Sequence, residues 1–159
     1  MRFILFFCLL ILIGCSSQSK QDYSDHGQTQ NGTPEEILAI LWDYNANIPD
    51  YPNPYSTARK ATLPFDEKIF QFNYEEVWDE STNVSEEQAK IEATRLSILE
   101  NQLKNDPDGS NHGFLEILSK EGYGLRMQYV GKYRNLEKRD TIQIEISPEE
   151  IKNILNRYN

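Results

Sequence analysis

The chain has 159 residues, and 25 Asp and Glu against 16 Lys and Arg give it a formal net charge of −9. An acidic protein of this size is repelled by nucleic acid and by anionic lipid, so we expect no nucleic-acid partner. Two cysteines and two histidines leave few residues for redox, metal or acid–base chemistry.

The first segment is a short apolar run. Arg2 is followed by residues 3–13, which are all apolar apart from Cys8, itself a small hydrophobic residue. One positive charge before such a run is typical of a secretory signal peptide. The run is too short to span a hydrocarbon core, which needs about 20 helical residues. We therefore predict a signal peptide over residues 1–14.

The run ends in Leu12-Ile13-Gly14-Cys15. This ending resembles the lipobox of bacterial lipoproteins. The resemblance implies cleavage before Cys15, attachment of diacylglycerol to its sulfur and acylation of the new amino terminus. By the same resemblance, Ser16 in place of Asp favours the outer membrane over the inner membrane. Two or three acyl chains hold a protein stably on a bilayer, because each buried methylene contributes about 0.8 kcal/mol. The alternative is an ordinary secretory signal with an incidental cysteine.

The lipobox interpretation leaves the mature chain without a thiol. Cys8 is lost with the signal and Cys15 carries the lipid, so we expect no disulfide, no Cys nucleophile and no thiolate metal site. Residues 16–32 contain one aromatic and no aliphatic side chain. Such a segment buries too little apolar surface to offset its ordering entropy, so we predict a flexible lipidated tether over residues 15–32. Residues 33–159 are enough for one domain with one core.

Three helices are predicted from the same start signal. Each start has a hydroxyl residue followed by acidic residues, as in a capping box, where side chains satisfy the free backbone N–H groups. Apolar residues then recur at intervals of three and four, which places them on one helix face. The starts are Thr33-Pro34-Glu35-Glu36, Ser85-Glu86-Glu87-Gln88 and Ser147-Pro148-Glu149-Glu150.

Three further segments alternate apolar and polar residues, as antiparallel strands with one face in water do. They are centred on Phe72, Met127 and Ile144. The last two are joined by residues 131–140, which are too few for a crossover helix, so we predict a hairpin. Residues 114–120 fit a short helix or a strand; their spacing and Gly122 as a cap favour the helix.

These elements predict an α+β fold, with a small antiparallel sheet of about three strands and helices packed on one face. The outline resembles small exported bacterial proteins of unknown function, in which a Leu-Pro segment precedes one strand and a Gly-led strand precedes the last. The matching residues here are Leu63-Pro64, Phe70-Gln71-Phe72-Asn73-Tyr74 and Gly124-Leu125-Arg126-Met127-Gln128-Tyr129. This resemblance implies no activity.

Residues with catalytic chemistry are sparse. His112 follows Asp108-Gly109-Ser110-Asn111, which lacks the glycines of a nucleophile elbow, so we interpret this segment as an exposed turn. The acidic residues between 75 and 92 could act as an acid–base pair or bind a hard cation, but acidic residues near helix starts are usually solvated. We expect no catalytic residue, no metal site and no cofactor, and we do not expect an enzyme.

Two surfaces are candidates for binding. Residues 131–140 carry four basic side chains on an acidic chain: Lys132, Arg134, Lys138 and Arg139. Such a group can bind a carboxylate-rich ligand or lipid headgroups, or it can simply protect a sheet edge. In residues 48–55, prolines stiffen a loop whose Tyr51 and Tyr55 either stack on a partner or fold back over the core beside Trp42.

The resulting prediction is a non-enzymatic lipoprotein of the bacterial cell envelope. It is held in the lipid bilayer through acylated Cys15 and acts by binding a protein partner, as an immunity or inhibitor protein does. A small-molecule or cell-wall binding module that uses the polar sheet face and the tyrosine loop is the alternative. An enzyme is the third class, and no residue pattern supports it.

Overall fold

A computed structural model describes residues 32–48, 56–106, 109–134 and 137–158. The predicted signal peptide, nearly all of the predicted tether, Cys15, Tyr51 and Tyr55 lie outside the described residues. In the described part of the chain, no helix combines the length and the apolar character needed to cross a bilayer.

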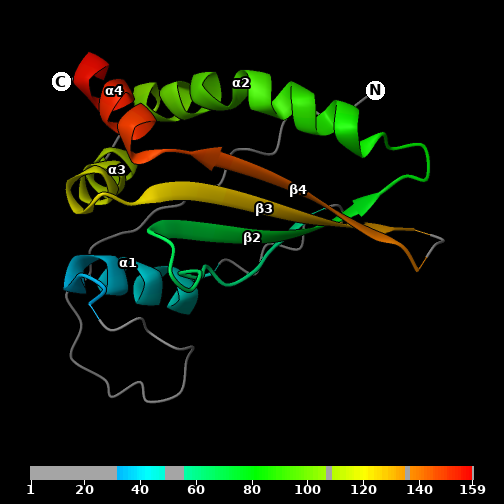
Figure 1. Ribbon diagram of the computed structural model, residues 1–159, viewed down its shortest axis with the longest axis horizontal. Helices are drawn as coiled ribbons and strands as arrows, with labels where there is room; N and C mark the ends of the chain where they lie inside the picture. The colour runs from blue at the N-terminus through cyan, green and yellow to red at the C-terminus, as the bar shows by residue number, and fades with distance from the viewer. Residues whose placement is uncertain (1–31, 49–55, 107–108, 135–136, 159) are drawn as a thin grey trace.

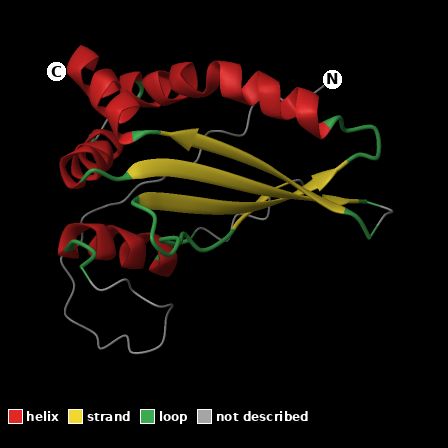
Figure 2. Cartoon of the chain, viewed as in Figure 1, coloured by secondary structure: helices red, strands yellow, loops and turns green. Residues whose placement is uncertain are grey.

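The described residues form four helices and a four-stranded sheet (Figures 1 and 2). In chain order the elements are α1 (Glu35–Ala46), β1 (Ser56–Ala58), β2 (Ile69–Trp78), α2 (Val84–Lys104), α3 (Ser110–Glu121), β3 (Gly124–Tyr133), β4 (Arg139–Ile146) and α4 (Pro148–Tyr158). The strand order in the sheet is β1-β2-β3-β4. The predicted α+β class and the β3–β4 hairpin are confirmed.

The sheet differs from the prediction in two respects. The prediction of about three strands missed β1, which has 3 residues and pairs antiparallel with β2. The sheet is also mixed and not purely antiparallel, because β2 and β3 run parallel, with Ile69 opposite Gly124 and Trp78 opposite Tyr133. The cause is the connection between them: α2 and α3 carry the chain back, so that β3 starts beside the start of β2.

The helix starts follow the predicted capping chemistry only in part. In α1 the N-cap position is Pro34, which forms no side-chain cap, where Thr33 was predicted. The Glu150 N–H donates to the Ser147 hydroxyl at 3.2 Å, and the Ser147 N–H donates to the Glu150 carboxylate at 2.9 Å, so the predicted capping box of α4 forms. In α2 the cap is Asn83, whose side chain accepts from the Glu86 N–H at 3.3 Å. Ser85, the predicted cap, lies inside the helix.

Residues 114–120 are helical, as favoured from the sequence, but α3 is longer and starts at Ser110. The interpretation of this start as an exposed turn was therefore wrong. The His112 backbone N–H donates to the Asp106 carboxylate at 3.0 Å. Asp106 therefore satisfies one of the backbone N–H groups that have no partner within α3. Gly122 caps the other end in the left-handed conformation, with φ of 72°.

The core lies between one face of the sheet and the helices. Successive rows across β2, β3 and β4 on this face are Phe70, Leu125 and Ile146, and then Phe72, Met127 and Ile144. The Tyr44 ring of α1 packs on Phe72 with centroids 4.7 Å apart, and the Phe114 ring of α3 packs on Phe70 at 5.3 Å. From α4, the buried residues are Ile151, Ile154 and Leu155. Helix α2 runs along the outer edge of β4, while α1 lies toward the other edge of the sheet, next to β2 (Figure 1).

Candidate functional site

The face of the sheet turned away from the core carries mainly polar side chains, and we call it the polar face. Its residues alternate with the core residues along each strand. They are Ile69, Gln71, Asn73, Glu75 and Val77 of β2, Arg126, Gln128, Val130 and Lys132 of β3, and Arg139, Thr141, Gln143 and Glu145 of β4. The polar face has no aromatic residue, because every aromatic side chain of these strands alternates onto the core side.

Arg126 is the centre of a polar network at the end of this face where β3 begins. Its guanidinium lies 2.5 Å from the Glu67 carboxylate and 2.7 Å from that of Glu145, and it donates to the Gln71 side-chain oxygen at 3.2 Å. The Arg126 side chain is only 12% exposed. Burial lowers the pKa of Arg126, but the hydrogen bonds to both carboxylates outweigh burial and raise the pKa above its usual value. This end of the polar face is therefore satisfied internally.

Glu75 holds the middle of the polar face together. Its carboxylate accepts hydrogen bonds from Arg59, which lies just beyond β1, and from Lys132 of β3 at 2.9 Å. These two hydrogen bonds lower the pKa of Glu75 below its usual value. Lys132 is thus engaged within the protein.

The four basic residues predicted to form one binding surface are divided between the two sides of the hairpin. Lys132 and Arg139 lie opposite each other in the β3–β4 register, on the polar face. Lys138 instead pairs with Asp140 at 2.7 Å, and its ammonium lies 5.0 Å from the centroid of the Tyr133 ring, on the core side. Lys138 is therefore not part of the surface that carries Lys132 and Arg139.

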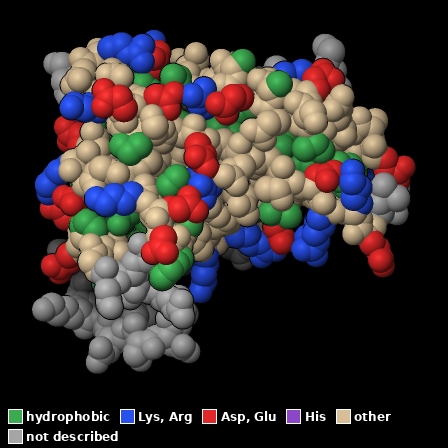
Figure 3. Space-filling view, viewed as in Figure 1, with side chains coloured by type: hydrophobic (Ala, Val, Ile, Leu, Met, Phe, Trp, Pro, Cys, Tyr) green, Lys and Arg blue, Asp and Glu red, His purple; other side chains and the backbone are tan. Residues whose placement is uncertain are grey.

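Two cations, Lys132 and Arg139, lie opposite each other on the polar face where β3 ends and β4 begins, and Arg134 follows β3 directly in the chain. We call these three residues the basic end of the polar face. Arg134 and Arg139 are exposed. Among the described residues neither forms an ion pair, in contrast to Lys132. On the side of the molecule seen in Figure 3, basic and acidic side chains are interspersed. The positive charge available to a partner is therefore a local group of cations and not a basic surface that extends over the protein.

Sequence reasoning grouped Glu76 with the solvated acidic residues, and the structure places it elsewhere. It lies on the core side, where the Trp78 indole N–H donates to its carboxylate at 2.8 Å. Burial raises the pKa of Glu76, and the bond from Trp78 opposes this only in part. Beside it, the rings of Tyr74 and Tyr129 stack with centroids 4.9 Å apart. The available signal was the period of two, which puts Glu76 on the same side as Tyr74.

The acidic residues of α2 pair with basic residues of the same helix. Lys90 lies 2.8 Å from Glu86 and 3.0 Å from Glu87, and Arg95 lies 3.0 Å from Glu92. His112 Nδ1 lies 3.7 Å from the Glu116 carboxylate, one turn along α3. In the part of the chain that the structure describes, no group of three or more His, Cys, Asp and Glu is placed to hold a metal ion.

Comparison with known proteins adds little. No protein-family model matches the sequence, and no curated protein matches it. A solved structure of a Pseudomonas aeruginosa protein, described as a "putative secreted protein", matches with a TM-score of 0.41 and 13% identity over 73% of this chain and 89% of that chain. A likeness at this level carries no information about the activity, partners or location of this chain.

Proposed function

We propose that this protein is a non-enzymatic lipoprotein of the bacterial cell envelope, anchored through acylated Cys15 in the outer membrane, and that its domain binds a protein partner through the basic end of the polar face. The observation that carries the binding proposal is the pair Arg134 and Arg139. Both are exposed on an acidic protein, and neither has an ion pair among the described residues.

The polar face is suited to recognition because its other charges are already neutralised. Glu75 is held by Arg59 and Lys132, and Arg126 by Glu67 and Glu145. A guanidinium is a planar fork that loses little side-chain freedom per bond, so Arg139 on this sheet and Arg134 just beyond β3 can hold carboxylates bidentately. The partner surface is therefore acidic, and charge complementarity sets the association rate as well as the specificity.

Charge reversal tests this proposal. The variant Arg134→Glu/Arg139→Glu is expected to lose the protein that the wild type captures from envelope extracts. The matched control is Lys60→Glu/Lys152→Glu, which makes the same change in net charge at two exposed positions outside the basic end. Equal capture by both variants would remove the basic end from consideration. Loss in both would point to net charge alone.

The anchor has its own test. Cells that express the wild type and are fed radiolabelled palmitate are expected to label the protein, and Cys15→Ser is expected to abolish the label. A labelled Cys15→Ser variant would contradict the anchor assignment and leave the binding proposal standing.

A cell-wall binding module is a second candidate, supported by a row of three amides across the polar face. Asn73, Gln128 and Gln143 lie opposite one another in β2, β3 and β4. The Asn73 amide is already bonded to Lys60, Thr62 and Gln71, so the Gln128 amide nitrogen and the Gln143 amide oxygen are the groups that would bind an uncharged polar ligand such as a glycan or a peptide. Cosedimentation with purified cell-wall sacculi tests this function: binding that is reduced by Gln128→Ala and unchanged by Arg134→Glu/Arg139→Glu would favour it over the protein partner.

A further inference from the structure

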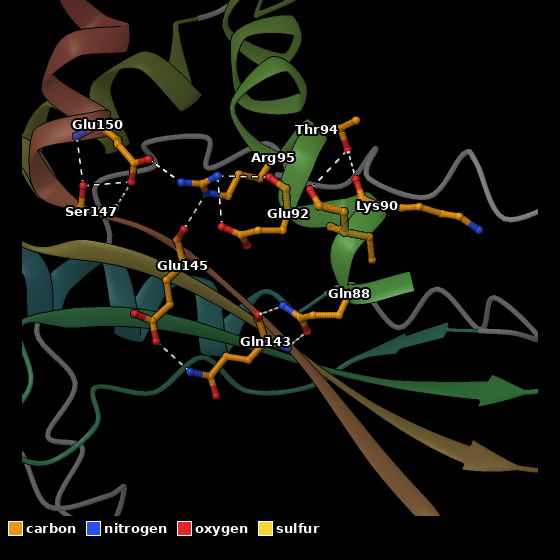
Figure 4. Close-up of polar contacts among 10 residues, drawn as sticks. Gln88, Lys90, Glu92, Thr94, Arg95, Gln143, Glu145, Ser147 and Glu150 are labelled. Atoms are coloured by element: carbon orange, nitrogen blue, oxygen red, sulfur yellow. Dashed lines mark hydrogen bonds and ion pairs between the residues drawn. The ribbon is translucent and has the colours of Figure 1, made fainter. Parts of the chain in front are cut away.

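The outer edge of β4 is closed by side chains of α2 (Figure 4). The Gln88 amide donates to the Gln143 backbone carbonyl at 2.6 Å and accepts from the Gln143 N–H at 3.1 Å. Seven residues further along α2, Arg95 Nε donates to the Glu145 carbonyl at 3.0 Å. These are backbone groups that point away from β3, and they are the groups a further strand would bind.

The contact at this edge has a polar part and an apolar part. The Arg95 guanidinium lies 2.5 Å from Glu150, which ties α2 to the start of α4, and 3.0 Å from Glu92 one turn earlier in α2. The buried residue of α2 is Leu99, which lies beyond Arg95, and nearer the start of the helix Val84 and Ile91 are partly buried. The first half of α2 is thus held at the sheet by the hydrogen bonds of Gln88 to β4 together with the packing of Val84 and Ile91.

Strand β4 is complementary to itself along this edge. If two copies of β4 pair antiparallel about Gln143, then Gln143 faces its own copy, Thr141 faces Glu145, and Ile142 faces Ile144. Residues 141, 143 and 145 are those whose backbone groups point outward, so this register makes them the hydrogen-bonded pairs. The isoleucines stay on the core side and the polar residues on the polar face in both copies.

We propose that the outer edge of β4 is a pairing surface for a second copy of this chain, and that Gln88 and Arg95 hold it closed in the monomer. The Gln88 amide makes the same two hydrogen bonds to Gln143 that a neighbouring strand makes. Exchange of the helix for a strand therefore leaves no backbone group of Gln143 unsatisfied. This inference does not depend on the proposed function.

The test removes the two polar contacts and keeps the aliphatic stems. In sedimentation of the full chain in detergent, Gln88→Leu/Arg95→Met is expected to form dimers with a dissociation constant lowered about tenfold or more relative to the wild type, as the loss of two or more hydrogen bonds implies. Lys90→Met is the matched control, because it removes one positive charge from the exposed side of the same helix. It is expected to behave as the wild type.

Two further variants identify the edge. Gln143→Pro removes an N–H that faces α2 and not β3, so the β3–β4 ladder is kept, and adding it to the double variant is expected to restore the monomer. Thr141→Cys/Glu145→Cys is expected to form disulfide-linked dimers on mild oxidation in the Gln88→Leu background, whereas Thr141→Cys alone is not. The pair cannot close within one copy, because four strand residues span about 13 Å.

Three results overturn the proposal. The first is a Gln88→Leu/Arg95→Met variant that melts cooperatively and stays monomeric at every concentration. The second is a dimer that persists after Gln143→Pro, since it must use another surface. The third result applies if the double variant does not fold. It is the absence of a cross-linked dimer when Thr141→Cys/Glu145→Cys is made in the Gln88→Leu variant and that protein folds.

Discussion

Glu75 and Glu76 are neighbours in β2, yet they lie on opposite faces of the sheet and their pKa values shift in opposite directions. Hydrogen bonds from Arg59 and Lys132 lower the pKa of Glu75 on the polar face. Burial raises the pKa of Glu76 on the core side, where its bond is to Trp78. The two faces are therefore stabilised by different interactions. Ion pairs and hydrogen bonds near water stabilise the polar face, whereas close packing of desolvated side chains stabilises the core side.

The largest expected contrast is between a core residue and a polar-face residue of adjacent strands. Phe70→Ala removes a fully buried ring between Phe72 and Phe114. It is expected to lower the free energy of unfolding by about 3–5 kcal/mol. Gln128→Ala on the polar face is expected to change it by less than about 0.5 kcal/mol. Urea denaturation measures both, and losses of similar size would contradict the comparison.

Two glycines test how closely the core side of the sheet is packed. At Gly131 a Cβ would overlap the Trp78 indole, which lies directly over the strand. Gly131→Ala is therefore expected to lower the free energy of unfolding by about 3 kcal/mol. At Gly113, inside α3, a Cβ meets no atom within 4 Å.

Gly113→Ala is the matched control, because alanine favours the helix over glycine. It is expected to raise the free energy of unfolding by about 0.5–1 kcal/mol. If both substitutions shift the urea midpoint in the same direction, then the Trp78–Gly131 contact is not tight.

The polar side is tested by Arg126→Met. It removes a guanidinium that two carboxylates hold, and we expect the free energy of unfolding to fall by about 1–2 kcal/mol. The cost stays below that of a fully buried charge, because Glu67 and Glu145 remain accessible to water. Arg139→Met, at an exposed residue, is expected to have no measurable effect. An equal loss in both variants would show that the Arg126 network contributes nothing specific.

The smallest expected effects are the pH dependences of the two glutamates, which have opposite signs. A lowered folded-state pKa means that Glu75 stabilises the fold above its usual pKa of 4.5, and that this contribution is lost as the pH falls through the lowered value. A raised folded-state pKa means that the contribution of Glu76 is present below 4.5 and is lost as the pH rises through the raised value.

Melting temperatures from about pH 4 to pH 7 separate the two. At neutral pH, Glu75→Gln is expected to melt below the wild type, and Glu76→Gln above it. The advantage of Glu76→Gln should shrink as the pH falls toward 4.5. A Glu76→Gln variant that melts below the wild type at neutral pH would show that the ionised carboxylate is stabilising where it lies.

Much of the fold could be predicted because its signals are local. The alternation around Phe72, Met127 and Ile144 marks three strands, and Ser147-Pro148-Glu149-Glu150 marks the start of α4. The failures have a physical cause too. The three-residue β1 is too short to show a period, and alternation is the same in parallel and antiparallel strands, so it does not reveal the direction of β2 relative to β3.

The candidate site was predicted less well than the fold. The composition of residues 131–140 indicated a basic group, but whether Lys132 and Lys138 share a surface depends on the register of the hairpin. The structure separates them, because Lys138 turns to Asp140 and Tyr133. Likewise, Gln88 and Arg95 are ordinary polar residues of a helix in the sequence. Their role at the edge of β4 follows from contacts between residues that are 55 and 50 positions apart in the chain.

Local signals in the sequence located four helices and the three longer strands and marked most of the side chains that face the core, because capping and hydrophobic period act over a few residues. It also supplied the case for a lipid anchor, through Leu12-Ile13-Gly14-Cys15. Long-range packing set the parallel direction of β2 and β3, the place of β1, the separation of Lys138 from Arg139, and the closure of the β4 edge by α2. These depend on long-range contacts whose geometry is set when the whole chain packs around one core.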